Sequence, residues 1–194
     1  MNSLQFIPLL SVAAIYGARL LELNAKRQTI RGEVRENLTL RLFMMVGTAT
    51  LAGSVLEYMV RGAQPNWLLF GLGWICAVSS FWIRSKAIAA LGRFWSLHIE
   101  IRENHEFVQS GPFRFVRHPA YFSMILELAA LALICGAIWT LLLVPIFFIP
   151  ALYLRIRLEE AALIEKFGPA YVEYRRNTPA LFPAIWKSRS INPH

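Results

Sequence analysis

The chain of 194 residues contains no aspartate, because all 12 of its acidic residues are glutamates. This absence excludes mechanisms that depend on an aspartate, such as Walker-B magnesium sites, kinase-type catalytic loops and hydrolase triads with an aspartate member. Charge in general is scarce: 16% of the residues are charged and 56% are hydrophobic, against about 25% and roughly 45–50% in an ordinary soluble domain. These figures exclude a disordered chain and disfavour a soluble globular enzyme.

Cysteine is scarce as well. Cys76 and Cys135 each lie in an apolar run, far apart and without a CxxC or Cys/His spacing. We expect both to be small core residues, so the sequence predicts neither a disulfide framework nor a cysteine metal site. The N-terminal stretch MNSLQFIPLL also lacks the basic region of a secretory signal, and we interpret it as the start of a retained helix.

The excess of hydrophobic sequence lies in blocks close to the roughly 20 residues that a helix needs to cross a bilayer. The expected spans are residues 2–20, 42–60, 67–83, 120–136 and 139–154. Pro145 and Pro150 predict a bend in the last span, and Gly136 predicts a tight turn between the last two. The sequence therefore predicts an all-α integral membrane protein with about five transmembrane helices.

Basic residues predict how these spans are oriented. With an odd number of crossings, 19 of the 20 Lys and Arg residues fall on one side of the membrane and only Arg61 on the other. Cytoplasmic loops carry the excess of basic residues, so we expect the N-terminus outside and the C-terminus in the cytoplasm. The longer polar segments, 84–119 and 155–194, would then be cytoplasmic. The net charge of +8 reflects this topology and gives no support to nucleic-acid binding.

No internal repeat or low-complexity linker divides the chain, so residues 1–194 are expected to form a single membrane domain. Residues 1–83 would hold three N-terminal spans. Residues 84–194 would form the catalytic part, with a helical hairpin at 120–158, a C-terminal cap and a cofactor pocket on the cytoplasmic face.

The motif RHPAY, from Arg117 to Tyr121, lies directly before the fourth span. Proline is favoured at the first helical position and disfavours helix in the residue before it, so we expect His118 at the N-cap and a helix from Pro119. The free amides of a helix N-terminus, with Arg117 beside them, suit an anion such as a carboxylate. His118 and Tyr121 would share one helical face. Taken alone, Arg117 and Tyr121 are equally well explained as anchors at the membrane boundary.

Three further features have both a structural and a functional interpretation. His98 and His105 lie among glutamates, but without HExxH or paired cysteines a metal site is disfavoured and none is predicted. Arg155 and Glu159, at i and i+4 on a helix that continues from the fifth span, are explained as a surface ion pair if they have no other role. Glu127 is the one charge near the middle of a span, where carboxylates are costly, so it either packs helices through a hydrogen bond or faces a substrate pocket.

Three stretches together carry a resemblance to a known family: HEFVQSGPFRFVRHPAY from His105 to Tyr121, EEAALIEKFG from Glu159 to Gly168, and YVEYRRNTPALFP from Tyr171 to Pro183. In this order around a helical hairpin, they resemble the isoprenylcysteine carboxyl methyltransferase family, whose wider relatives are membrane phospholipid methyltransferases. The resemblance covers roughly residues 98–183. The first three spans match only in being hydrophobic.

The resemblance implies an integral membrane methyltransferase that uses S-adenosylmethionine and releases S-adenosylhomocysteine. It assigns to the cofactor site His98, His105, Glu106, Phe107, Val108, Phe113, Arg117, His118, Pro119, Ala120, Tyr121 and Glu159. Phe113 lies where such enzymes can have a tyrosine, so a hydroxyl contact would be lost there. Arg155 matches the family's substrate-side arginine and is the expected catalytic residue, holding the acceptor carboxylate, with Glu127 as a second candidate for substrate binding.

We therefore expect carboxyl methylation of a prenylated cysteine or a similar lipid-borne acid, with the lipid entering from the bilayer between the helices. A phospholipid N-methyltransferase is the alternative in the same class, and its amine acceptor would need a general base. The 37-residue hairpin between Tyr121 and Glu159 and the tyrosines after it favour the carboxyl branch. A non-catalytic membrane protein and an NADPH-dependent membrane reductase are the alternatives outside the class.

Overall fold

The computed structural model describes residues 3–25, 33–34, 38–62, 64–96, 100–101 and 108–183. Its helices are α1 (Phe6–Asn24), α2 (Leu38–Arg61), α3 (Trp67–Leu91), α4 (Pro119–Ile134), α5 (Ile138–Phe167) and α6 (Pro169–Asn177). Short 3-10 turns occupy Ser3–Gln5, Gly92–Phe94 and Gly111–Arg114, and two-residue strands β1 (Glu33–Val34) and β2 (Glu100–Ile101) pair antiparallel. Within the described ranges, the prediction of an all-α protein is confirmed apart from this short strand pair.

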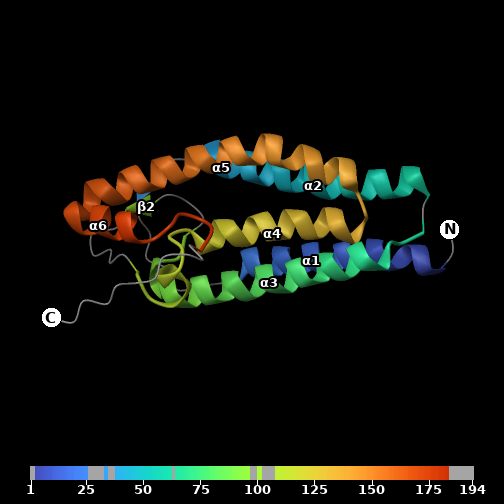
Figure 1. Cartoon of the computed structure of the whole chain (residues 1–194), viewed down its shortest axis with the longest axis horizontal. Coiled ribbons are helices and arrows are strands. Elements are labelled where there is room, and N and C mark those ends of the chain that lie inside the picture. The colour runs from blue at the N-terminus through green and yellow to red at the C-terminus, as the bar shows by residue number, and fades with distance from the viewer. Residues whose placement is uncertain are drawn as a thin grey trace.

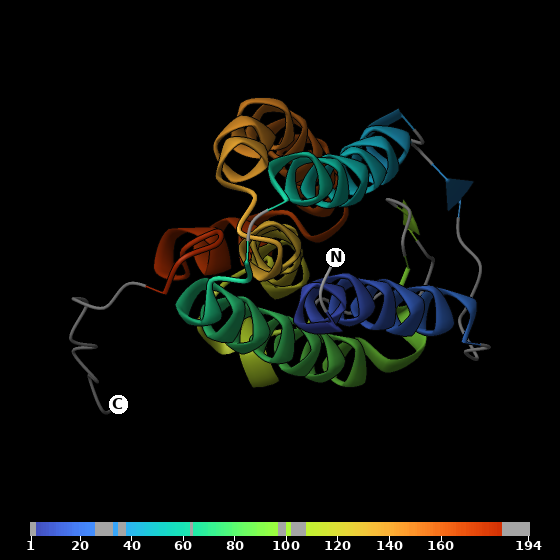
Figure 2. The same ribbon diagram turned by 90° about the vertical axis from the view of Figure 1, so that its right-hand side faces the viewer.

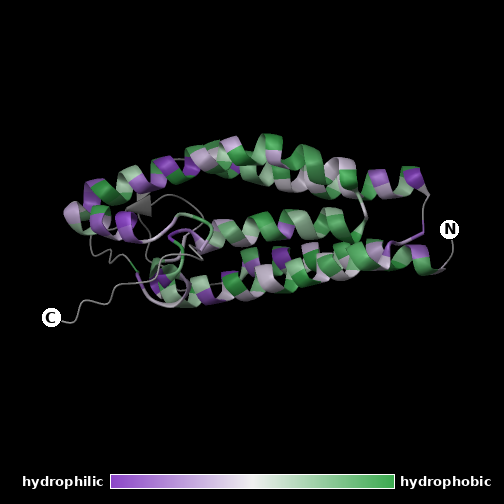
Figure 3. Cartoon of the chain, in the orientation of Figure 1, coloured by the Kyte–Doolittle hydropathy of each residue, from purple (hydrophilic) through white to green (hydrophobic). Residues whose placement is uncertain are grey.

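The helices α1 to α5 run side by side, each antiparallel to the one before it (Figure 1). One end of the bundle holds the short connections α2–α3 and α4–α5. The other end holds α6, the strand pair and the chain that leads into α4. Figure 3 shows hydrophobic residues along the middle of the long helices and hydrophilic residues gathered toward the end that carries α6. The start of α1 and the end of α5 lie at opposite ends of the bundle, as an odd number of antiparallel helices requires.

The helix α4 lies in the centre, between the pair α1–α3 on one side and the pair α2–α5 on the other (Figure 2). Four stretches are long and apolar enough to cross a bilayer: Ser3–Asn24, Leu38–Arg61, Trp67–Phe94 and Ile138–Phe167. With 16 residues, α4 is about 24 Å long, less than the roughly 30 Å of a bilayer core. The five predicted spans therefore correspond to four long membrane-spanning candidates around one shorter central helix.

Small residues allow α3 to pack closely against α4. The buried residues of α3 recur on a single helical face and are Gly73, Ala77, Ser80, Arg84 and Ala87. A Cβ atom on Gly73 would lie 2.6 Å from the Ile134 side chain, so only glycine fits at this crossing. The hydroxyl of Ser80 donates a hydrogen bond over 2.7 Å to the backbone carbonyl of Ser123. Close approach through small residues and hydrogen bonds between helices is typical of helix packing inside membranes.

The expectation that the third span ends at residue 83 and a polar segment begins at residue 84 is wrong, because α3 continues to Leu91. Arg84 belongs to the buried face of α3 and is 1% exposed. Its charge is balanced by glutamates on α1 and α4, and this balance is what allows a basic residue to remain inside the bundle.

The turn between α4 and α5 forms at Gly136, as predicted, with a positive φ of 59°. Glu57 of α2 caps the first turn of α5, where its carboxylate accepts hydrogen bonds from the backbone N–H groups of Trp139 and Thr140 over 3.2 and 2.9 Å. The helix α5 then runs unbroken through Pro145 and Pro150 and follows an arc in Figure 1. It ends at Phe167 rather than at residue 158, so the hairpin is longer than expected.

Candidate active site

A cavity of about 1240 Å³, including its solvent-open part, lies at the end of the bundle that carries α6. We call it the polar cavity. It brings together nine of the residues assigned from sequence: Val108, Phe113, Arg117, His118, Pro119, Ala120, Tyr121, Arg155 and Glu159. The assigned residues His98, His105, Glu106 and Phe107 lie outside the described residues. The polar cavity is thus built from segments far apart in the chain.

His118 is the N-cap of α4, and the helix begins at Pro119, as predicted. Nε2 of His118 lies 3.1 Å from Oε1 of Glu160, and both side chains are 3% exposed. Glu160 also accepts hydrogen bonds from Arg117, whose Nε and Nη2 lie 2.8 and 2.7 Å from the same oxygen. On its other oxygen it pairs with Arg175 of α6 over 3.2 Å. One buried carboxylate thereby holds together the start of α4, the end of α5 and α6.

Arg117 has protein partners at all three of its side-chain nitrogens. Besides Glu160, Nη1 donates to the carbonyl of Arg175 over 2.9 Å and to the carbonyl of Thr178. The backbone N–H groups of Arg117 and His118 donate to the carbonyls of Pro179 and Ala180, each over 2.9 Å. Arg117 lines the polar cavity and at the same time fastens the chain after α6 to the start of α4.

A second chain of polar contacts crosses the polar cavity through Tyr121. Its hydroxyl donates to Oε2 of Glu159 over 2.5 Å and accepts from Nε of Arg155 over 2.9 Å. Arg155 is 3% exposed, and its Nη1 donates to the hydroxyl of Thr39 over 2.9 Å. The rings of His118 and Tyr121 stack with centroids 5.5 Å apart, which confirms that they share one face of α4. Arg155 and Glu159 are therefore not an isolated surface ion pair, because Tyr121 joins them.

Two tyrosines of α6 close the polar cavity. The hydroxyl of Tyr174 donates over 2.7 Å to the backbone carbonyl of Phe113, whose ring lines the polar cavity. Burial raises the pKa of Tyr174 to about 12, against the opposing effect of the Arg117 guanidinium. Burial also raises the pKa of Tyr171. Both hydroxyls are therefore neutral hydrogen-bond donors at physiological pH.

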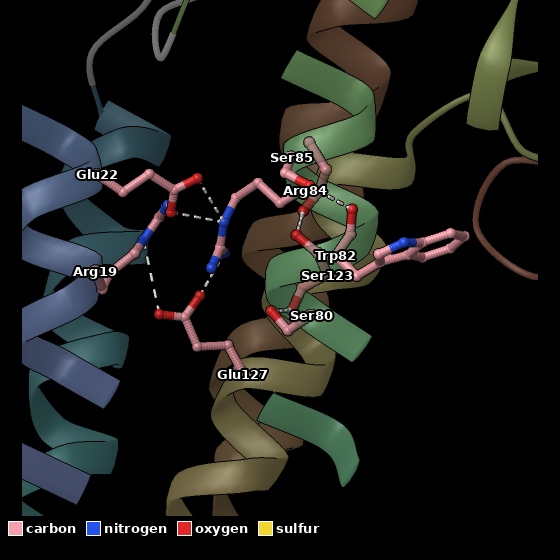
Figure 4. A network of polar contacts seen from close by, with 9 residues as sticks. Arg19, Glu22, Ser80, Trp82, Arg84, Ser85, Ser123 and Glu127 are labelled. Atoms are coloured by element: carbon pink, nitrogen blue, oxygen red, sulfur yellow. Dashed lines mark hydrogen bonds and ion pairs between the residues drawn. The ribbon is translucent and has the colours of Figure 1, made fainter. Parts of the chain in front are cut away.

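Glu127 does not line the polar cavity. Its carboxylate lies 2.5 Å from Nη1 of Arg84 and 3.6 Å from Nε of Arg19, and both arginines also contact Glu22 of α1 (Figure 4). These four residues, the Arg84 network, join α1, α3 and α4 within the bundle. Of the two interpretations of Glu127, the packing role is thus present in the structure, while its assignment to substrate binding stays a prediction.

A second cavity, which we call the apolar cavity, lies between α1, α2, α4 and α5. Its walls are almost entirely hydrophobic and come from Tyr16, Leu20, Leu23, Met44, Gly47, Thr48, Leu128, Leu131 and Phe148, with Arg19 and Glu127 as the charged members. It shares Arg19, Leu40, Phe43 and Met124 with the polar cavity. The two cavities therefore adjoin.

Three residues of this region were not predicted from the sequence. Glu160 was not separated from its neighbour Glu159, although only Glu160 is fully buried, with 3% of its side chain exposed against 31%. Arg19 was expected at the end of the first span and Arg84 in the polar segment after the third span, yet both line the polar cavity. The available signal was the helical spacing of Arg84 with Gly73, Ala77 and Ser80, which puts it on the packed face of α3.

Comparison with known proteins gives a family that agrees with this geometry. The model of the isoprenylcysteine carboxyl methyltransferase (ICMT) family matches residues 73–165, which include RHPAY and both glutamates. The protein-S-isoprenylcysteine O-methyltransferase B of Arabidopsis thaliana is 29% identical over 143 residues, which cover 68% of this chain and 71% of that relative. Both matches support the ICMT family for this chain.

Other relatives in the comparison carry different names. The protein YpbQ of Bacillus subtilis is 32% identical and is matched over 57% of this chain, and the cobalt-zinc-cadmium resistance protein CzcN of Cupriavidus metallidurans is 33% identical and is matched over 51%. The chain covers 66% of the first and 46% of the second. The ICMT match begins inside α3, earlier than the residue near 98 where the sequence resemblance began, and stops before α6.

Proposed function

We propose that the chain is an S-adenosylmethionine-dependent membrane methyltransferase acting on the carboxylate of a prenylated cysteine or a similar lipid-borne acid. The observation that carries the proposal is the shared wall of the two cavities. A polar cavity suits a charged cofactor and the reacting group, and an adjoining apolar cavity suits a hydrocarbon chain. The match to the family model and the names of the plant relatives support the same chemistry.

The residues that line the polar cavity fit the cofactor. The side chain of the N-cap residue His118 makes no capping hydrogen bond to the first amides of α4, and the first-turn residues Pro119, Ala120 and Tyr121 all line the polar cavity. The amides of Ala120 and Tyr121 would hold the methionyl carboxylate, because a helix N-terminus attracts anions. Glu159, with 31% of its side chain exposed, would accept hydrogen bonds from ribose hydroxyls. Since Glu160 already engages Arg117, these amides rather than Arg117 would make the direct contact.

S-adenosylmethionine would supply an electrophilic methyl group. The chain need not supply a general base, because a carboxylate acceptor is already ionised at neutral pH. Arg155 would hold that carboxylate, and its buried guanidinium is fixed for this role by Tyr121 and Thr39. Such positioning of the acceptor is an effective source of rate enhancement.

The lipid chain would occupy the apolar cavity. Residues of α1 and of α2 line this cavity from two sides, so a chain would enter from the bilayer between these helices. The reacting end would then extend past the shared wall into the polar cavity. We place the polar cavity on the cytoplasmic face, because the basic residues are concentrated at that end of the spans.

The test begins with calorimetric titration of S-adenosylhomocysteine into the detergent-purified protein, with NADPH as the control. We expect saturable micromolar binding of the first compound alone. Labelled methyl transfer is then measured to N-acetyl-S-farnesylcysteine and to phosphatidylethanolamine. A methyl ester releases labelled methanol in base, whereas an N-methyl group does not.

Base-labile label on the farnesylated acid would support carboxyl methylation. Base-stable label on the phospholipid alone would instead assign the chain to N-methylation. A folded protein that binds NADPH and no S-adenosylhomocysteine would overturn the methyltransferase proposal in favour of a reductase.

A further inference from the structure

The wall between the two cavities contains a single charged residue within the described part of the chain. Of the four residues common to both cavities, Leu40, Phe43 and Met124 are uncharged, and Arg19 is the exception. Arg19 lies on α1, outside the residues matched by the ICMT model. The family comparison therefore gives it no role.

The Arg84 network fixes the guanidinium of Arg19 at this wall (Figure 4). Nη1 of Arg19 donates to Glu22 over 2.8 Å, and Nε lies 3.6 Å from Glu127. Arg84 holds the same two carboxylates over 2.9 and 2.5 Å. Arg19 and Arg84 thus each pair with both glutamates, and the two cations balance the two carboxylates.

The position of Arg19 determines what an acceptor meets at the wall. An acceptor with its hydrocarbon chain in the apolar cavity and its reacting end in the polar cavity must cross beside Arg19. With 12% of its side chain exposed, Arg19 is largely shielded from water, so its charge acts strongly on a neighbouring group. A carboxylate there gains a charge-assisted hydrogen bond, and a protonated amine is repelled.

A second cation approaches the same wall from α5. The Arg155 guanidinium lies over the Phe43 ring, with 5.5 Å between its carbon and the ring centroid, and Phe43 is one of the shared residues. An acidic acceptor would thus meet cations from α1 and from α5. The helix α1 would thereby add charge selection to the site.

We propose that Arg19 is a specificity-determining residue that selects lipid acceptors carrying an anionic group and rejects those carrying an ammonium group. The inference rests on the proposed function, and it adds the residue through which the acceptor class is chosen.

The test compares Arg19→Gln with Glu22→Gln, using N-acetyl-S-farnesylcysteine as the acceptor. Both variants break the Arg19–Glu22 ion pair, but only the first removes the cation from the wall, because Glu22 lines neither cavity. We expect Arg19→Gln to raise the acceptor KM by about tenfold or more. The dissociation constant of S-adenosylhomocysteine should change by less than about twofold. Glu22→Gln should keep a nearly normal KM, and Arg19→Lys should be intermediate.

The double variant Arg19→Gln/Glu22→Gln keeps the Arg84–Glu127 pair and removes both charges of the Arg19–Glu22 pair. It provides a second measurement in case the single variant Arg19→Gln fails to fold. It should show the same rise in KM and an increased ratio of transfer to phosphatidylethanolamine. An unchanged KM in both Arg19→Gln proteins, with S-adenosylhomocysteine still bound, would overturn the inference. So would an equal rise in Glu22→Gln, which would make the network purely structural. Failure of the wild-type protein to bind S-adenosylhomocysteine would instead overturn the proposed function.

Discussion

Nε of Arg155 donates a hydrogen bond over 2.9 Å to the hydroxyl of Tyr121, which itself donates to Glu159 over 2.5 Å. Tyr121 thereby connects the residue proposed to hold the acceptor with a residue proposed to hold the cofactor. The two binding events share one hydroxyl. Changes at Tyr121 are therefore expected to affect both.

Replacing Tyr121 by Phe removes both hydrogen bonds and keeps the ring that stacks on His118. Hydrogen bonds to charged groups contribute about 1.5–3 kcal/mol each, so we expect kcat/KM for methyl transfer to fall by about tenfold or more. Tyr153→Phe is the matched control, because Tyr153 is 62% exposed and lies outside both cavities. Normal kinetics in Tyr121→Phe would remove the hydroxyl from the proposed mechanism.

Loss of Glu160 is expected to lower stability, whereas loss of the adjacent Glu159 is expected to weaken binding of S-adenosylhomocysteine. Glu160→Gln weakens the contacts with Arg117, His118 and Arg175 and should lower the free energy of unfolding by about 1.5–3 kcal/mol. Glu159→Gln should leave the thermal midpoint nearly unchanged and weaken S-adenosylhomocysteine binding about tenfold. Thermal unfolding in detergent and calorimetry measure the two effects. Equal destabilisation by both variants would contradict this division.

Gly47 offers a way to block the apolar cavity. It lines that cavity, and a Cβ atom there would meet nothing within 4 Å. Gly47→Phe should therefore fill space reserved for a lipid chain and abolish transfer to N-acetyl-S-farnesylcysteine while S-adenosylhomocysteine still binds. Gly71→Phe is the control, since Gly71 also has open space beside it and lines neither cavity. Full activity of Gly47→Phe would move the lipid chain elsewhere.

Tyr174 is expected to make the stability of the folded protein fall at alkaline pH. Its pKa rises from the ordinary value of 10 to about 12 in the folded protein, so folding favours the neutral hydroxyl. Its contribution is complete below about pH 10 and is lost as the pH rises toward 12. Tyr174→Phe should lower the thermal midpoint near neutral pH by removing the bond to the Phe113 carbonyl, and should reduce the alkaline decline. If the thermal midpoint of Tyr174→Phe fell with rising pH as steeply as that of the wild type, the decline would belong to other groups.

The predicted topology can be tested with two single-cysteine proteins made after replacing Cys76 and Cys135 by alanine. Gln64→Cys lies in the α2–α3 connection and Arg176→Cys in α6, and both positions are exposed. A membrane-impermeant maleimide should label Gln64→Cys in right-side-out vesicles and Arg176→Cys in inside-out vesicles. The reverse pattern would put the polar cavity outside.

Local sequence was sufficient for the helices and for part of the site. A bilayer crossing needs one continuous apolar run, so hydropathy located the spans. Proline and glycine act on the residues beside them, so the start of α4 at Pro119 and the turn at Gly136 were predictable.

The tertiary structure alone decided which polar residues are partners. Arg155 meets Thr39 across 116 positions of sequence, and Arg84 meets Glu22 across 62 and Glu127 across 43. Hydropathy gives Arg84 the same value in a loop as on a packed face, so it was assigned to the polar segment. Its burial depends on two carboxylates brought to it by α1 and α4. The same packing sets the cavities side by side, because their common wall is built from α1, α2 and α4.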